Sequence, residues 1–166
     1  MTTISLRLEE PRDHAAIHVV TEAAFRDMPH SDGDEADLVG KLRSDGDLAL
    51  SLVAEDGEQI VGHIAFSPVA ISDGTENWFG LGPISVLPEL HKQGIGSRLM
   101  RRGMADIRQM GARGVILLGD PAYYSRFGFA HDPQLSYPGP PAEYFQYLLI
   151  EGEMPQGEVR YAPAFG

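Results

Sequence analysis

Apolar residues along the chain follow two periods, one typical of β-strands and one typical of α-helices. Helical spacing appears after Pro11, around Val39 and again over 95–107. Strand-like runs of apolar residues cover 4–9, 48–54, 60–71, 78–86 and 115–118. This order of elements predicts an α/β (α+β) fold in which helices flank a sheet, and we expect the whole chain, 1–166, to form a single domain.

Turn residues predict how these strands pair. Asp-Gly pairs at 56–57 and 73–74 separate three successive runs, which favours an antiparallel meander. A long helical segment then separates 78–86 from 115–118, and the two strands of such a strand-helix-strand unit lie parallel to each other. The predicted sheet is therefore mixed.

The C-terminal third adds a short helix and a predicted hairpin. Asp120 suits an N-cap, Pro121 suits the first helical position, and Gly128 ends the turn. Two further runs, 144–151 and 158–161, flank a glycine-containing loop, and we expect them to pair as a closing hairpin. The complete expectation is a mixed, mostly antiparallel sheet of six to seven strands.

The composition fits a globular protein and excludes several classes of function. Hydrophobic residues make up 43% of the chain and charged residues 22%, which is enough apolar surface for a core. The 24 acidic and 13 basic residues give a net charge of −11, which repels nucleic acid, so we expect no nucleic-acid partner. Because there is no cysteine, disulfides, thiolate metal sites and cysteine nucleophiles are excluded, and we predict no metal site.

Nothing in the hydropathy pattern indicates a membrane protein. No apolar run reaches the roughly 18 residues that a bilayer span needs. The first residues alternate apolar and polar and lack the basic-then-apolar layout of a signal peptide. We therefore expect no membrane partner and a cytoplasmic location.

The segment 91–97, between a strand and the long helix, carries the clearest chemical signal. Gly94 and Gly96 remove side chains from this turn, so an anion can approach the free N–H groups at the helix start. Residues 92–113 hold six of the thirteen basic residues and a single acid, Asp106. On an acidic protein this local positive charge favours a polyphosphate ligand. The alternative is a solvated helix face whose arginines pair with neighbouring acids.

Two common nucleotide fingerprints do not match this turn. A dinucleotide site needs a third glycine where the chain has Leu99, and a P-loop needs Gly-Lys followed by Ser or Thr. The turn instead resembles the acetyl-CoA motif of the GNAT superfamily of N-acetyltransferases, which reads Arg or Gln, two residues, Gly, any residue, then Gly or Ala. It stands here as His91-Lys92-Gln93-Gly94-Ile95-Gly96, with His91 as the one departure. The order of elements resembles the same family along nearly the whole chain.

The resemblance implies a cofactor, acetyl-CoA, and a set of contacts to it. In the family, the strand before the motif splays from the parallel strand after the helix, and the pantetheine arm binds in the wedge. Backbone groups of Ile84, Ser85 and Val86 would pair with the arm, and an N–H near Val86 would polarise the thioester carbonyl. The pyrophosphate would bind at the glycine turn. The residues expected to bind the cofactor are Ile84, Ser85, Val86, His91, Lys92, Gln93, Gly94, Ile95, Gly96, Ser97 and Arg98.

Acyl transfer to an amine needs a general acid and a general base. Tyr124 stands before Gly128-Phe129 at the spacing of the family's general acid, and a phenol with a pKa near 10 stays protonated at neutral pH. Many family members carry a base on the central strands, but 77–88 contains no acid. His63 is our candidate, and its alternative is a hydrogen-bonded structural role. Three more candidates have no distinguishing spacing: Glu22, His30 and Glu76.

The expected acceptor is a primary amine. The stretch 27–37 has five acids and no lysine or arginine, and it follows the first helix, where the family builds much of its acceptor pocket. It favours a cationic amine, or else it only solvates a loop. Four aromatic residues are expected either in the same pocket or in the core: Trp78, Tyr144, Phe145 and Tyr147.

We predict an acetyl-CoA-dependent N-acetyltransferase in which the amine attacks directly, with a small-molecule amine favoured over a protein or peptide amine. One alternative is a non-catalytic acyl-CoA-binding or sensor module. Another is an interaction protein that uses its closing hairpin as a dimer surface, and a homodimer is compatible with either function.

Overall fold

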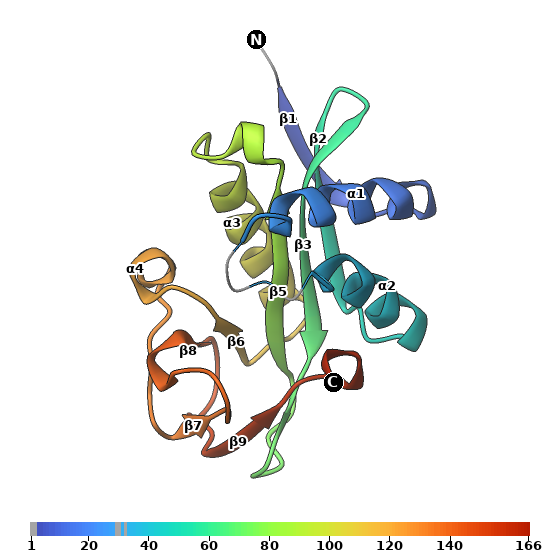
Figure 1. Cartoon of the computed structure of the whole chain (residues 1–166). Helices are drawn as coiled ribbons and strands as arrows, with labels where there is room; N and C mark the ends of the chain where they lie inside the picture. The colour runs from blue at the N-terminus through green and yellow to red at the C-terminus, as the bar shows by residue number, and fades with distance from the viewer. Residues whose placement is uncertain (1–2, 29–30, 32) are drawn as a thin grey trace.

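Thirteen helices and strands make up the part of the chain that the computed structural model describes, residues 3–28, 31 and 33–166 (Figure 1). In order they are β1 (Ile4–Leu8), α1 (His14–Phe25), α2 (Glu35–Asp45), β2 (Leu50–Asp56), β3 (Gln59–Pro68), β4 (Ala70–Ile71), β5 (Trp78–Val86), α3 (Ile95–Gln109), β6 (Gly114–Leu118), α4 (Pro121–Tyr124), β7 (Leu135–Ser136), β8 (Phe145–Leu149) and β9 (Gly157–Arg160). Short 3-10 turns connect several of them.

Six strands form the main sheet, in the order β1-β2-β3-β5-β6-β8. All neighbours are antiparallel except β5 and β6, which are parallel. The predicted mixed sheet, the meander through β2, β3 and β5, and the strand-helix-strand unit are thereby confirmed.

The predicted closing hairpin is wrong. β8 pairs with β6 at the end of the main sheet, whereas β9 pairs with β4 and β7 in a second sheet of three strands. The run 60–71 also divides, because β3 ends at Pro68 and β4 leaves the main sheet. Val159 of β9 is buried with Ile71 and Leu135 in a separate apolar cluster, which is the packing that draws β9 away from β8.

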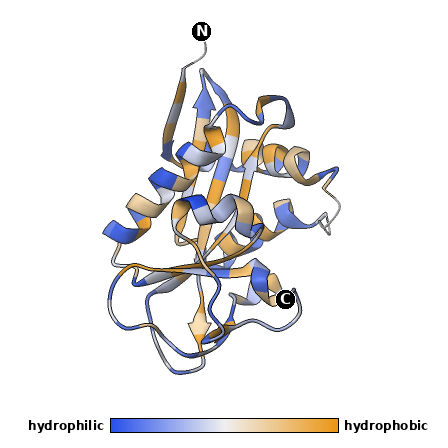
Figure 2. Cartoon of the chain, turned by 90° about the vertical axis from the view of Figure 1, so that its left-hand side faces the viewer, coloured by the Kyte–Doolittle hydropathy of each residue, from blue (hydrophilic) through white to orange (hydrophobic). Residues whose placement is uncertain are grey.

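Helices cover both faces of the main sheet. α1 and α2 lie in front of it in Figure 1 and α3 lies behind it. The amphipathic spacing of α3 buries Ile95, Leu99 and Ile107 against the sheet. In Figure 2 apolar residues concentrate on the strands, while the helices carry hydrophilic residues on their outer sides. The three longer helices, α1, α2 and α3, therefore each have one side in a core and one in solvent.

Close packing of α3 on β3 depends on Gly103. A Cβ at this position would lie 2.7 Å from Cε1 of Phe66, a side chain with no exposed surface. We expect Gly103→Ala to lower the free energy of unfolding by about 1–3 kcal/mol. Gly40, inside α2, has no atom within 4 Å of such a Cβ. Gly40→Ala should therefore raise stability by up to about 1 kcal/mol. Urea unfolding gives the change in free energy of unfolding for each variant. A change of the same sign in both variants would contradict the packing argument.

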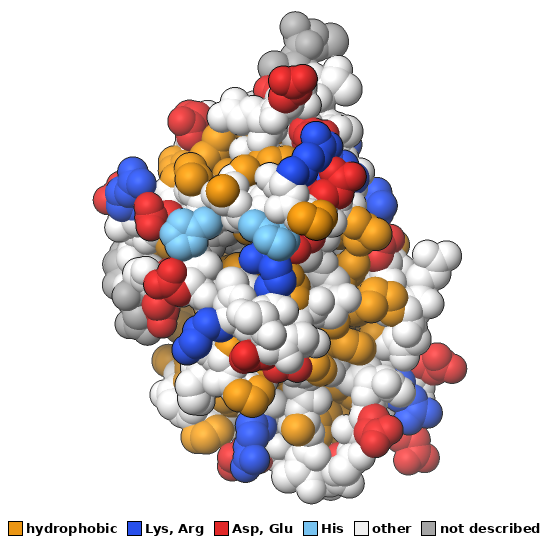
Figure 3. All heavy atoms as spheres, turned by 90° about the vertical axis from the view of Figure 1, so that its right-hand side faces the viewer, with side chains coloured by type: hydrophobic (Ala, Val, Ile, Leu, Met, Phe, Trp, Pro, Cys, Tyr) orange, Lys and Arg blue, Asp and Glu red, His pale blue; other side chains and the backbone are white. Residues whose placement is uncertain are grey.

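The surface mixes charges of both signs with scattered apolar side chains. Figure 3 shows this on the face that carries α1 and α2. Within the described residues, none of the helices is long and apolar enough to cross a bilayer.

Candidate functional site

β5 and β6 part after a short parallel contact. Residues 78–80 pair with 114–116, and the pairing stops there although both strands continue. On its other side β5 carries one extra residue relative to β3 between Leu81 and Ile84. Gly82 has φ +135° within this bulge, a backbone conformation that favours glycine. The bulge bends β5 away from β6 and opens a wedge.

The backbone of β5 alternates between β3 and the wedge. The N–H of Leu87 donates to the carbonyl of Val61 on β3 at 3.0 Å, so residue 85 also turns its backbone toward β3. Ile84 and Val86 therefore turn their backbone groups toward the wedge, where the pantetheine arm was expected. Ser85 differs from them, because its backbone faces β3 and its side chain is buried.

His91, the departure from the family motif, ties the end of β5 to the turn. Its Nε2 lies 2.9 Å from the carbonyl oxygen of Val86. Since a carbonyl only accepts, Nε2 carries the hydrogen and donates it. The N–H of Val86 is not involved in this bond. The imidazole thus fixes the strand end and leaves that N–H for a ligand.

The glycine turn presents backbone N–H groups at the start of α3. Gly94 is the N-cap with φ +84°, and Lys92 also has a positive φ, of 65°. The N–H of Arg98 makes the first bond of the helix, to the carbonyl of Gly94, at 3.0 Å. The N–H groups of residues 95–97 therefore have no partner within the helix. Such a run of N–H groups at a positive helix end binds anions.

A cavity of about 640 Å³ occupies the wedge and joins this turn to α4. Its wall combines basic side chains, Lys92 and Arg126, with apolar ones that include Ala24, Met28 and Ile84. The full lining is Ala24, Met28, Ile84, Val86, Leu90, His91, Lys92, Gly94, Ile95, Gly96, Ser97, Tyr123, Tyr124 and Arg126. It includes eight of the eleven predicted cofactor residues. Ser85, Gln93 and Arg98 are not part of it, and the latter two are exposed.

Tyr124 lies in the wall of this cavity, on α4. Asp120 caps α4 by accepting from the N–H of Ala122 at 2.9 Å, and Pro121 begins the helix, as predicted. A Cβ at Gly119 would overlap the ring of Tyr124. Burial, with smaller contributions from Tyr123 and Asp120, raises the pKa of Tyr124 to about 12. The phenol is therefore protonated throughout the physiological range.

Sequence reasoning missed part of the cavity wall. Tyr123 and Arg126 share one side of the α4 region, with the guanidinium 4.5 Å from the ring centroid. Their spacing of three residues on a predicted short helix was the available signal. Ala24 and Met28, at the end of α1, come from the other face of the sheet. Nothing local in the sequence connects α1 with the glycine turn.

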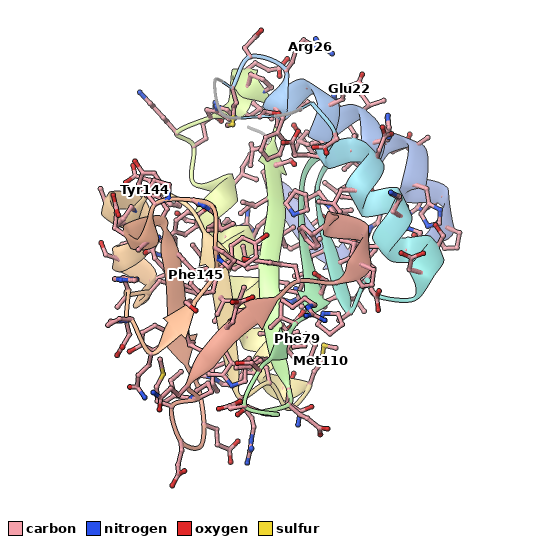
Figure 4. All side chains as sticks on the ribbon, turned by 60° about the horizontal axis from the view of Figure 1, so that its bottom comes forward. Glu22, Arg26, Phe79, Met110, Tyr144 and Phe145 are labelled. Atoms are coloured by element: carbon pink, nitrogen blue, oxygen red, sulfur yellow. The ribbon has the colours of Figure 1, made fainter. Side chains whose placement is uncertain are left out.

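Several candidates from the sequence lie elsewhere. Trp78 is 1% exposed and packs on Gly114. Together with Phe145 it belongs to the apolar cluster that contains Val159 of β9. Tyr144 is exposed, and Figure 4 places it on the far side from α1. Tyr147 packs against the same cluster as Phe145. These aromatics do not line the cavity in the wedge.

The acidic candidates are also outside the described cavity wall. Asp34, Glu35 and Asp37 mark the start of α2, where negative charge stabilises a helix. Glu22 lies 3.6 Å from His18 on the outer side of α1 (Figure 4). Glu76 is exposed in the loop before β5. His30 and Asp32 lie outside the described residues.

His63 is fully buried in β3, beneath α1 and α2, and does not line the cavity. Its Nε2 lies 2.7 Å from Oγ of Ser51 on β2. Burial lowers the pKa of His63 to about 4; Glu9 opposes this shift and Arg43 adds to it. The imidazole is therefore neutral at pH 7.

Acid should destabilise the protein through His63. The unfolded chain takes up a proton near pH 6.5 and the folded one only near pH 4, so stability is complete above pH 6.5 and is lost as the pH falls toward 4. Between pH 8 and pH 5 this loss is about 2 kcal/mol. In His63→Gln, urea unfolding should show a correspondingly smaller difference between the two pH values. An identical pH dependence in the variant would contradict the shift.

Comparisons with known proteins agree with this geometry. A family model described as an acetyltransferase (GNAT) domain matches residues 47–131. YhbS of Escherichia coli K12, named as an uncharacterized N-acetyltransferase, is 38% identical over 151 residues, which are 88% of this chain and 87% of YhbS.

Solved structures show the same fold over the full length. A GNAT family acetyltransferase from Brucella melitensis, solved in complex with acetyl-CoA, has a TM-score of 0.89 and 48% identity and covers 99% of both chains. The structure of E. coli YhbS in complex with CoA has a TM-score of 0.85 and 35% identity, covering 99% of this chain and 93% of YhbS. The chain therefore belongs to the GNAT superfamily of acetyltransferases.

Proposed function

We propose that this protein moves an acetyl group from acetyl-CoA to a primary amine, which attacks the thioester directly. The observation that carries the proposal is the wedge between β5 and β6, because one cavity there is lined both by the anion-binding turn and by a protonated tyrosine. The relatives from B. melitensis and E. coli, solved with acetyl-CoA and CoA, support this choice of cosubstrate.

The turn has the space that a diphosphate needs. A Cβ at Gly96 would lie 3.7 Å from the hydroxyl oxygen of Tyr123 and 3.9 Å from Cγ2 of Val86, inside the cavity wall. In the proposed complex the N–H groups of residues 95–97 bind the diphosphate and Lys92 adds positive charge. His91 orients the turn, and Gln93, Ser97 and Arg98 flank the phosphates.

The free edge of β5 suits the pantetheine arm. An amide-bearing arm that lies beside Ile84 and Val86 takes the place of a neighbouring strand, and the N–H of Val86 polarises the thioester carbonyl. Ser85 contributes no backbone group to this edge. In the proposed complex, only Ile84 and Val86 therefore pair with the arm through their backbone groups.

Tyr124 is the proposed general acid. When the amine attacks the thioester carbon, the carbon–sulfur bond breaks and the thiolate needs a proton. The phenol supplies it. Because burial raises the pKa of Tyr124 to about 12, this transfer is less favourable than an unperturbed phenol would allow, but the acid is never lost at working pH.

A small-molecule amine is the proposed acceptor. The cavity wall that holds Tyr124 also includes the apolar side chains of Ala24, Met28 and Ile84, which suits a compact apolar group next to the amine. None of the described lining residues is acidic, so this wall does not itself select a polycation. The alternative of a non-catalytic acyl-CoA sensor uses the same turn but not Tyr124. A homodimer and a cytoplasmic location stay predictions.

A screen of amines tests the proposal. Acetyl-CoA is mixed with the protein and with phenethylamine, spermidine, an aminoglycoside or a lysine-containing peptide, and free CoA is followed with a thiol reagent. We expect turnover that depends on the added amine and is fastest with a small-molecule amine. Binding of acetyl-CoA in calorimetry without turnover of any amine would favour the sensor. Absence of acetyl-CoA binding would contradict both the transferase and the sensor.

A further inference from the structure

Two cationic side chains line the cavity in the wedge, and they come from different elements. Lys92 belongs to the glycine turn, whereas Arg126 follows α4. None of the described lining residues is acidic. On a protein with a net charge of −11, a wall of this kind favours an anionic ligand. Arg126 thus brings positive charge to the proposed coenzyme site from outside the turn.

Contacts within its own segment hold the guanidinium of Arg126 in place. Its Nε donates to the carbonyl oxygen of Tyr123 at 2.9 Å, and its central carbon lies 4.5 Å from the centroid of the Tyr123 ring. Among the described residues, Arg126 takes part in no ion pair. The two Nη groups are therefore available to a ligand, and their planar fork suits bidentate bonds to a phosphate.

The hydroxyl of Tyr123 faces the glycine turn. A Cβ at Gly96 would lie 3.7 Å from this oxygen, so the hydroxyl lies beside the first turn of α3. The ring packs on Tyr124 and Phe127, with centroids 4.9 Å and 5.5 Å away, which limits its movement. A phosphate held by the N–H groups of residues 95–97 would therefore have a hydroxyl donor next to it.

We propose that Tyr123 and Arg126 are specificity-determining residues that bind the phosphate groups of the coenzyme. The Tyr123 hydroxyl donates to the diphosphate, and the Nη groups of Arg126 donate to phosphate oxygens, which only accept. The pair selects a thioester of CoA over a thioester of pantetheine alone, because pantetheine has no phosphate for either residue to bind. This inference rests on the coenzyme part of the proposed function and not on the transfer step.

Two variants and two ligands test the pair. Arg126→Gln removes the charge, and Tyr123→Phe removes only the hydroxyl. In calorimetry we expect the Kd of acetyl-CoA to rise at least about tenfold in Arg126→Gln and about fivefold or more in Tyr123→Phe. S-acetylpantetheine, measured by its competition with acetyl-CoA, should bind the wild type and both variants with the same Kd. An equal loss for S-acetylpantetheine would overturn the proposal, as would wild-type affinity for acetyl-CoA in either variant.

Arg101 of α3 offers a matched control for the loss of charge. Its guanidinium also lies over an aromatic ring, 5.6 Å from the centroid of Phe127, but Arg101 is exposed and does not line the cavity. Arg101→Gln removes the same charge from the same region, and we expect the Kd of acetyl-CoA to stay within about twofold of the wild type, because solvent screens an exposed charge. A loss as large as that in Arg126→Gln would show general attraction instead of contact and would overturn the proposal.

Acetyl-dephospho-CoA, which lacks only the 3′-phosphate, separates the two kinds of phosphate. Tyr123→Phe should lose as much affinity for it as for acetyl-CoA, and an undiminished affinity would overturn the placement of the hydroxyl on the diphosphate. In Arg126→Gln, an equal loss assigns the guanidinium to the diphosphate and a smaller loss assigns it to the 3′-phosphate. Both results support binding of Arg126 to the phosphates.

These binding measurements need no acceptor amine, so the two proposals can fail separately. A wild type that binds acetyl-CoA but acetylates no amine would contradict the proposed transfer and leave the role of Tyr123 and Arg126 standing. Variants that bind acetyl-CoA like an active wild type would overturn that role and leave the transfer standing. Absence of acetyl-CoA binding by the wild type would overturn both.

Discussion

Tyr124→Phe should lower kcat for acetyl transfer at least about tenfold while leaving the affinity for acetyl-CoA near that of the wild type. The ring, which packs on Gly119 and meets Tyr123 edge-on at 4.9 Å, is retained in the variant. Only the proton donor is removed. Steady-state assays of CoA release give kcat, and calorimetry gives the affinity.

Tyr144→Phe is the matched control, because the side chain of Tyr144 is exposed and does not line the cavity. Its kcat should equal that of the wild type. The raised pKa of Tyr124 adds a second readout, since an acid with a pKa of about 12 causes no loss of kcat between pH 8 and pH 10. Unchanged turnover in Tyr124→Phe would remove the tyrosine from the mechanism.

Gly96→Asp should weaken acetyl-CoA binding by about 100-fold or more, equivalent to about 2.7 kcal/mol, without unfolding the protein. Space for a Cβ exists at this position, and an acid in the first turn of α3 favours the helix through its dipole. The same carboxylate occupies the proposed diphosphate site and repels the ligand. Stability and binding should therefore change in opposite directions.

Gly96→Asn separates charge from bulk, because asparagine has nearly the shape of aspartate. We expect Gly96→Asn to bind acetyl-CoA more tightly than Gly96→Asp does. Calorimetry gives the affinity of each variant, and thermal unfolding gives its stability. Wild-type affinity in Gly96→Asp would place the diphosphate elsewhere on the protein.

The features that the sequence predicted well are local. The turn at 91–97, the long helix after it and the cap at Asp120 each depend on neighbouring residues, and each forms as expected. The parallel contact of β5 with β6 follows from a handed crossover rule that needs only the order of elements. The alternation of a strand also predicts that the backbone groups of Ser85 face the opposite edge from those of Ile84 and Val86, since successive residues turn their backbone groups to opposite edges.

The features that it missed depend on distant partners. Nothing near 158–161 distinguishes pairing with β8 from pairing with β4 and β7, because each choice satisfies the same alternation. The hydrogen bonds that join His63 to Ser51, and Ser51 to Glu9, likewise need the register of β2 against β3 and the position of Glu9 after β1. A histidine in an apolar run signals burial or chemistry, and its partners decide between them.

Gly119 has a wider consequence for how variation in this protein is interpreted. It is the residue without a side chain on which the tyrosine ring rests, and Gln146 donates to its carbonyl at 2.9 Å. A methyl group there would push the phenol out of line while every group that handles substrate kept its identity. With Tyr124 as the proposed general acid, we expect homologues that keep the tyrosine but have a bulkier residue in place of Gly119 to lack transferase activity, although a motif search still scores them as active.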